Sequence, residues 1–160
     1  MSGWDTFAVI VGGVGGALVG LLFVAISIHA KQIAGSASLR GRAAQTLVIF
    51  ATLLLLAIVL AIPSQPDRVI GAELVALAVG AAILLILLDR SAGDVATDPS
   101  LGRVLKRVNP NITTALGVAL TGVLLLTGVD WAPYTLLPTT CVAIVGGLAS
   151  AYLLLTKLSE

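Results

Sequence analysis

The stretch TFAVIVGGVGGALVGLLFVAISIH, residues 6–29, decides the class of this protein. A helix needs about 20 mostly apolar residues to cross the hydrocarbon core of a bilayer. Residues 6–29 meet that length without a single Asp, Glu, Lys or Arg. The sequence therefore predicts a transmembrane helix near the N-terminus.

Four further apolar runs follow, at residues 43–62, 69–88, 112–129 and 135–155. Polar clusters that contain proline separate the second run from the third and the fourth from the fifth. Only 11% of the 160 residues are charged and 58% are hydrophobic, whereas about a quarter of an average soluble domain is charged. We expect one membrane domain over residues 1–160, an all-α bundle of five transmembrane helices.

The positions of lysine and arginine predict the orientation of this bundle. Cytoplasmic loops of membrane proteins carry an excess of these two residues. Eight of the nine fall on one side of the predicted topology, and Arg68 alone falls on the other. The eight are Lys31, Arg40, Arg42, Arg90, Arg103, Lys106, Arg107 and Lys157. We expect the N-terminus outside, the C-terminus in the cytoplasm, and a multi-pass location in a bacterial inner membrane.

The third connection is predicted to hold a short amphipathic helix at residues 99–108. Its apolar residues recur at helical spacing, and three cations lie on the other side: Leu101, Val104, Leu105 and Val108 against Arg103, Lys106 and Arg107. Such a helix lies on the inner leaflet, with its cations toward anionic lipid headgroups. The alternative is a solvated loop whose periodicity is accidental.

Small residues recur every four positions in three of the predicted spans. The rows are Gly12, Gly16 and Gly20, then Ala72, Ala76 and Gly80, and then Ala143, Gly147 and Ala151. Small residues let membrane helices approach closely. The glycine row packs either within its own bundle or against copies of itself in other subunits. The second span is rich in Leu and Ile, so we expect it to face lipid more than the others do.

One carboxylate, Glu73, falls inside a predicted span, about four residues from the outer end of the third. Thr139 and Thr140 of the fifth span are expected at a similar depth, and Pro138 frees backbone groups beside them. A carboxylate near hydroxyl groups predicts an ion or proton site. The alternative is a structural role, in which Glu73 reaches headgroup water or links two helices.

Enzyme signatures are missing from the sequence. It has no phosphate-binding loop, no nucleophile elbow and no histidine-rich metal motif. The segments outside the membrane are too short for a catalytic domain. We expect no catalytic residues, no cofactor, no metal and no nucleic-acid partner.

Residues 20–27, GLLFVAIS, end the glycine-rich first span and lead into a basic connection. This pattern resembles small bacterial multi-span membrane proteins that have a glycine-rich first helix. The resemblance covers the first two spans and implies no activity.

Two functions fit these features, and the first is the one that we expect. The first is a homo-oligomeric membrane protein that conducts an ion or small solute, supported by the glycine row and Glu73. The second is a non-conducting accessory or regulatory protein that binds a larger membrane partner through its glycine-rich faces. No chain of polar residues leads inward from Glu73, so conduction would need a pore shared between subunits.

Overall fold

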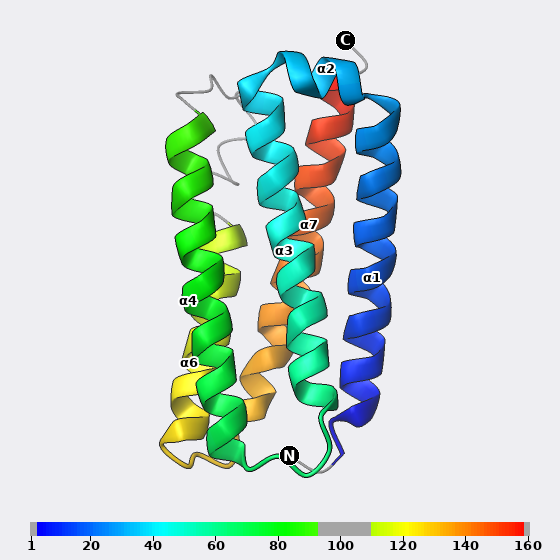
Figure 1. Cartoon of the computed structure of the whole chain (residues 1–160). Helices are drawn as coiled ribbons and strands as arrows, with labels where there is room; N and C mark the ends of the chain where they lie inside the picture. The colour runs from blue at the N-terminus through cyan, green and yellow to red at the C-terminus, as the bar shows by residue number, and fades with distance from the viewer. Residues whose placement is uncertain (1–2, 93–109, 159–160) are drawn as a thin grey trace.

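The computed structural model describes residues 3–92 and 110–158 of the chain. In these two parts every regular element is a helix, and neither part contains a strand. The elements in chain order are α1 (Asp5–Ile28), α2 (Ala30–Gly35), α3 (Ala37–Ala61), α4 (Asp67–Ala92), α6 (Pro110–Leu126), the 3-10 helix η1 (Ala132–Thr135) and α7 (Leu136–Leu158) (Figure 1). The predicted all-α fold class is therefore confirmed.

Four helical stretches in the described parts are long and apolar enough to cross a membrane. They are α1, α3, the stretch Asp67–Leu88 of α4, and the stretch Ala132–Thr156, which consists of η1 and most of α7. α6 is also apolar but has 17 residues. At 1.5 Å per residue it is about 26 Å long, near the lower limit for a spanning helix. The chain is a membrane protein with several apolar helices, and α6 is the shortest of the five long helices in the described parts.

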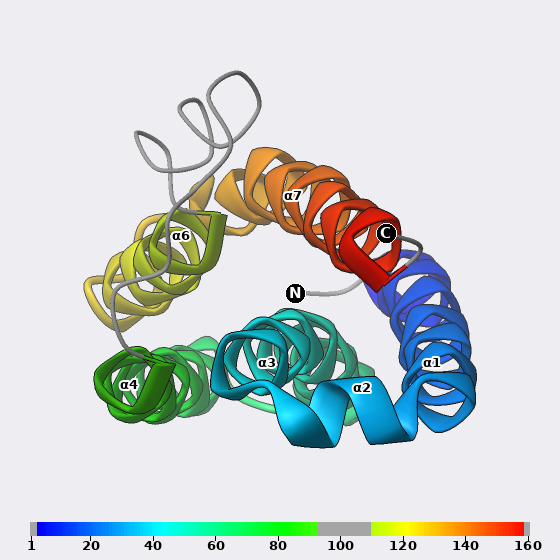
Figure 2. The same cartoon turned by 90° about the horizontal axis from the view of Figure 1, so that it is seen from above.

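Successive long helices run in opposite directions, so α1 begins and α7 ends at opposite ends of the bundle (Figure 1). Seen from above, α3 lies between α1 and α4, and α6 lies between α4 and α7 (Figure 2). We call the end where α1 begins the outer end and the opposite end the cytoplasmic end, following the orientation predicted from the cations. The predicted amphipathic helix, with Arg103, Lys106 and Arg107, lies outside the described residues.

The position of α3 contradicts the expectation that the second span faces lipid. In its most apolar stretch 56% of the residues are buried, against 17% in that of α1. Phe50, Leu53 and Leu56 of α3 are each at most 1% exposed. The expectation was wrong because large side chains fill the spaces that small residues on neighbouring helices leave open.

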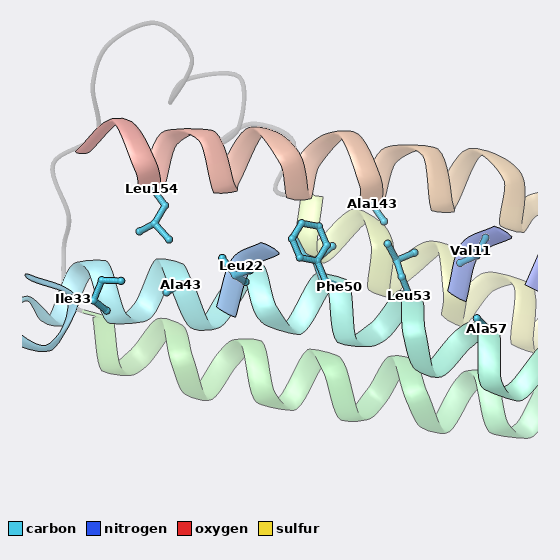
Figure 3. Packing of buried hydrophobic residues seen from close by; sticks show 10 residues of the cluster. Val11, Leu22, Ile33, Ala43, Phe50, Leu53, Ala57, Ala143 and Leu154 are labelled. Atoms are coloured by element: carbon cyan, nitrogen blue, oxygen red, sulfur yellow. The ribbon is translucent and has the colours of Figure 1, made fainter. Parts of the chain in front are cut away.

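One such contact joins α3 to α7 inside the bundle. Phe50 belongs to a buried cluster with Leu53, Ala143 and Leu154 (Figure 3). A methyl group placed on Gly147 would lie 2.3 Å from Cε1 of the Phe50 ring. The missing side chain of Gly147 thus makes the room that the phenyl ring occupies.

Aromatic rings join α1 to η1 at the outer end. Trp4 meets Phe7 edge to face at 5.1 Å between ring centroids, and it meets Tyr134 in the same way at 5.6 Å. Tyr134 belongs to η1, so these rings connect the first and last parts of the chain. Tryptophan and tyrosine are common at the level of lipid headgroups, which agrees with this end lying at a membrane surface.

Candidate functional site

Glu73 is half-buried on α4, and its carboxylate is bound by a side chain from the connection before that helix. Nε2 of Gln65 donates to Oε1 and to Oε2 of Glu73, each at 3.2 Å. Gln65 lies only eight residues earlier, between α3 and α4. The interaction therefore holds the turn at the outer end against the first turns of α4.

The structure does not bring Glu73 together with the two threonines. Oγ1 of Thr139 donates to the carbonyl of Thr135 at 2.7 Å, and Oγ1 of Thr140 donates to that of Leu136 at 2.9 Å. Both hydroxyls therefore bond to their own helix turn. No hydrogen bond links either threonine to Glu73 within the described parts of the chain.

The reason for this separation is the position of α6 between α4 and α7 (Figure 2). A methyl group on Gly117 of α6 would lie 2.3 Å from Oγ1 of Thr139, so this threonine packs on α6. Sequence reasoning placed the third and fifth spans at the same depth but could not tell that the fourth comes between them. The predicted site of Glu73, Thr139 and Thr140 is therefore not assembled as one cluster.

The glycine row of α1 divides between two faces of the helix. A methyl group on Gly12 would meet Cβ of Ala57 at 3.1 Å, and one on Gly15 would meet the backbone nitrogen of Leu54 at 3.4 Å. By contrast, nothing lies within 4 Å of a methyl group placed on Gly16 or on Gly20. Gly12 thus packs inside the bundle, while Gly16 and Gly20 face outward.

The other two small-residue rows differ in the same way. Ala76 and Gly80 of α4 are exposed, and a methyl group on Gly80 would have nothing within 4 Å. Gly147 of α7 is buried against Phe50. The row on α7 therefore packs within the chain, whereas the row on α4 remains on the surface of the bundle.

Another close helix contact uses two glycines that lie outside the predicted rows of small residues. A methyl group on Gly71 of α4 would lie 2.8 Å from the carbonyl oxygen of Gly122 of α6. A methyl group on Gly122 would likewise lie 2.8 Å from the carbonyl oxygen of Gly71. No small residue stands four positions before or after either glycine. A search for small residues at four-residue spacing could not have found this contact.

Toward the cytoplasmic end, α4 and α6 border a groove of about 400 Å³. Its walls are residues of α4 between 78 and 86 and residues of α6 between 111 and 119, nearly all apolar. Two carboxamide side chains, Gln45 of α3 and Asn111 of α6, also line it. A mostly apolar pocket of several hundred Å³ with a few polar groups is typical of ligand-binding sites.

Comparison with protein families, with curated proteins and with solved structures finds no match to this chain. The function therefore has to be argued from the geometry of its own residues.

The described residues contain no group of three His, Cys, Asp or Glu side chains that could hold a metal ion. His29 ends α1, and its Nδ1 lies 3.1 Å from the carbonyl oxygen of Ala25, within the same helix. The features that remain for function are the outward glycine face of α1, the outward small residues of α4 and the groove.

Proposed function

We propose that this membrane protein self-associates through the outward glycine face of α1 and forms a non-conducting homo-oligomer. The observation that carries the proposal is the exposure of Gly13, Gly16, Ala17 and Gly20, which share one face of α1. A methyl group on any of the three glycines would have nothing within 4 Å.

This face lies opposite the side of α1 that packs on the bundle. Ala8, Val11, Gly15 and Leu22 are the buried residues of α1. With 3.6 residues per turn, they point about 180° away from the outward glycines. The bundle therefore leaves the smoother, glycine-rich side of α1 available to another helix.

Small residues on a lipid-facing surface gain little from contact with lipid alone. In membranes, helices associate by close backbone approach, and small residues make that approach possible. The outward face of α1 offers such a surface over about two helical turns. This supports a helix from another chain as its neighbour.

A second outward row of small residues lies on α4, at Ala72, Ala76 and Gly80. α1 and α4 lie at opposite edges of the bundle, with α3 between them (Figure 2). Contact between α1 of one copy and α4 of the next would be head-to-tail, and such contacts form rings when the rotation closes. We therefore propose copies of this chain, rather than an unrelated protein, as the first partner to test.

The composition of the same two faces supports the non-conducting form. A pore shared between subunits needs polar groups along the face that lines it. From Val9 to Val24 the exposed residues of α1 are all apolar, and so are those of α4 from Ala72 to Leu87. Any part of α1 or α4 that bordered a shared pore along these residues would therefore present apolar side chains.

The test of self-association is the mass of the protein in lipid nanodiscs, compared between wild type and Gly16→Leu. We expect several copies for wild type and a single copy for Gly16→Leu, because the leucine keeps the helices apart. Cys141→Leu is the matched control, since Cys141 is exposed on α7, away from both rows. A monomeric wild type, or equal masses for wild type and Gly16→Leu, would contradict the proposal.

A flux assay in liposomes tests the non-conducting form. We expect liposomes that contain wild-type protein to release ions no faster than liposomes without protein. Liposomes that contain Glu73→Gln should behave in the same way. If wild type conducts and Glu73→Gln does not, the protein is a channel and Glu73 belongs to its ion path.

A further inference from the structure

The groove between α4 and α6 opens sideways toward the bilayer. Val79 and Ile86 of α4 and Ile112 and Leu116 of α6 border it, and each is more than half exposed. Deeper in the groove, Ala78 and Ala115 are buried. Because the exposed borders are apolar, an occupant would enter from the lipid rather than from water.

The length of the groove matches one leaflet. Its walls extend over residues 78–86 of α4 and 111–119 of α6, about 12 Å along each helix at 1.5 Å per residue. Half of a typical hydrocarbon core is about 15 Å thick. The groove can therefore hold most of the length of one acyl chain in the cytoplasmic half of the bilayer.

The polar side chains lie at the cytoplasmic end of this groove. Gln45 follows Arg42 by three residues on α3, so it lies about 4.5 Å deeper along the helix axis. Arginines at a membrane surface remain near the headgroups, which places Gln45 near the ester groups of the lipids. Asn111 is the second residue of α6, and α6 begins part-way down the bundle and runs to the outer end (Figure 1).

Gln45 makes no hydrogen bond to any residue in the described parts of the chain, although it is partly buried. A carboxamide without a partner is costly in an apolar environment. An ester carbonyl of a lipid in the groove would accept a hydrogen bond from Nε2 of Gln45.

We propose that this groove binds one phospholipid of the cytoplasmic leaflet. Its acyl chain lies between α4 and α6, and its ester region is hydrogen-bonded by Gln45. The groove faces α6, whereas the row Ala72, Ala76 and Gly80 lies on the adjoining side of α4. The two sites share α4 but use different residues of it.

The test uses nanodiscs of phosphatidylcholine and phosphatidylglycerol with a small fraction of phosphatidylcholine that carries a diazirine on one acyl chain. After photolysis, peptide mass spectrometry locates the labelled residues. We expect label on Ile112 and Ala115 at about ten times the level at Val145, which is exposed to lipid on α7 and lies outside the groove. Equal labelling would mean that only ordinary surrounding lipid is present, and the proposal would be wrong.

Two adjacent residues of α6 provide a matched pair of variants. Ala119 lines the groove, whereas Leu120 is 54% exposed and does not. We expect Ala119→Phe to abolish the groove labelling and Leu120→Phe to leave it unchanged. Ala82→Phe fills the groove from α4 and replaces Ala119→Phe if circular dichroism shows that the latter is unfolded.

Gln45→Leu tests the polar part of the site. A net hydrogen bond contributes about 1 kcal/mol, so we expect this variant to retain about fivefold less lipid after a detergent wash. Equal retention by wild type and Gln45→Leu would show that Gln45 does not hold the lipid. Crosslinks from the groove to a second copy of the chain, instead of to lipid, would overturn the whole proposal.

Discussion

At the crossing of α4 and α6, Gly71 and Gly122 bring two backbones together, whereas Gly13, Gly16 and Gly20 of α1 face away from every described neighbour. All five are glycines inside long apolar helices. At the crossing, an added methyl group would lie 2.8 Å from a carbonyl oxygen, and on the outward face of α1 it would meet nothing within 4 Å. Glycine is thus required by close packing at the α4–α6 crossing, whereas no contact within the chain requires it on the outward face of α1.

The difference shows that the spacing of glycines does not identify the face of a helix that packs. α1 packs on α3 through the side that carries Ala8, Val11, Gly15 and Leu22. Most of its glycines lie on the opposite side. A neighbouring helix packs where its own large side chains find room, as Phe50 does beside Gly147. Where no side chain of the protein packs beside a glycine, the surface at that glycine remains open to other molecules.

The largest effect is expected at the α4–α6 crossing. Gly122→Ala places a methyl group against the backbone of α4, which cannot move away as a flexible side chain can. We expect the free energy of unfolding to fall by about 3 kcal/mol, the upper range for overpacking. Unfolding in mixed detergent micelles, followed by circular dichroism, measures it. A loss below about 0.5 kcal/mol would show that the two helices do not cross at these glycines.

An intermediate effect is expected for Gly147→Ala. The added methyl group would meet the edge of the Phe50 ring, and a ring can shift more easily than a backbone. We expect a loss of about 1–2 kcal/mol in the free energy of unfolding, measured in the same assay.

Phe50→Leu provides the check on this second prediction. The double variant with Gly147→Ala and Phe50→Leu should be more stable than the sum of the two single losses predicts, because the smaller side chain makes room for the methyl group. Strict additivity would mean that the two residues do not touch.

The smallest effect is expected for Gly16→Ala and Gly80→Ala, measured on protein dispersed as monomers in detergent. An added methyl group has no neighbour at either position. The free energy of unfolding should therefore change by no more than about 0.5 kcal/mol, apart from a gain in helix propensity of up to about 1 kcal/mol. A loss as large as that of Gly122→Ala would show that these faces are packed within a single chain.

The helices themselves could be predicted from sequence because the bilayer imposes a length and an apolar composition on any segment that crosses it. The predicted runs 6–29 and 69–88 agree with α1 and α4 to within a few residues. The run 112–129 was placed well at its start, but its last three residues belong to the turn after α6.

The candidate sites were less accessible to sequence reasoning. Glu73 stood out as a carboxylate in an apolar run, but its partner Gln65 belongs to the preceding turn and meets it only because the chain reverses there. The groove could not have been predicted, because it depends on the way α4 and α6 lie beside each other. Gln45 gave no signal beyond being a polar residue in an apolar run.

The sequence by itself determined that this protein is a bundle of apolar helices, since every backbone group in a membrane must be hydrogen-bonded within its own segment. Only the tertiary structure decided which faces of those helices touch. It buried the Leu-rich α3, inserted α6 between α4 and α7, and turned Gly16 and Gly80 outward. The physical reason is that helix contacts in lipid depend on the fit between particular side chains and the spaces opposite them, and one helix does not encode that fit without its neighbour.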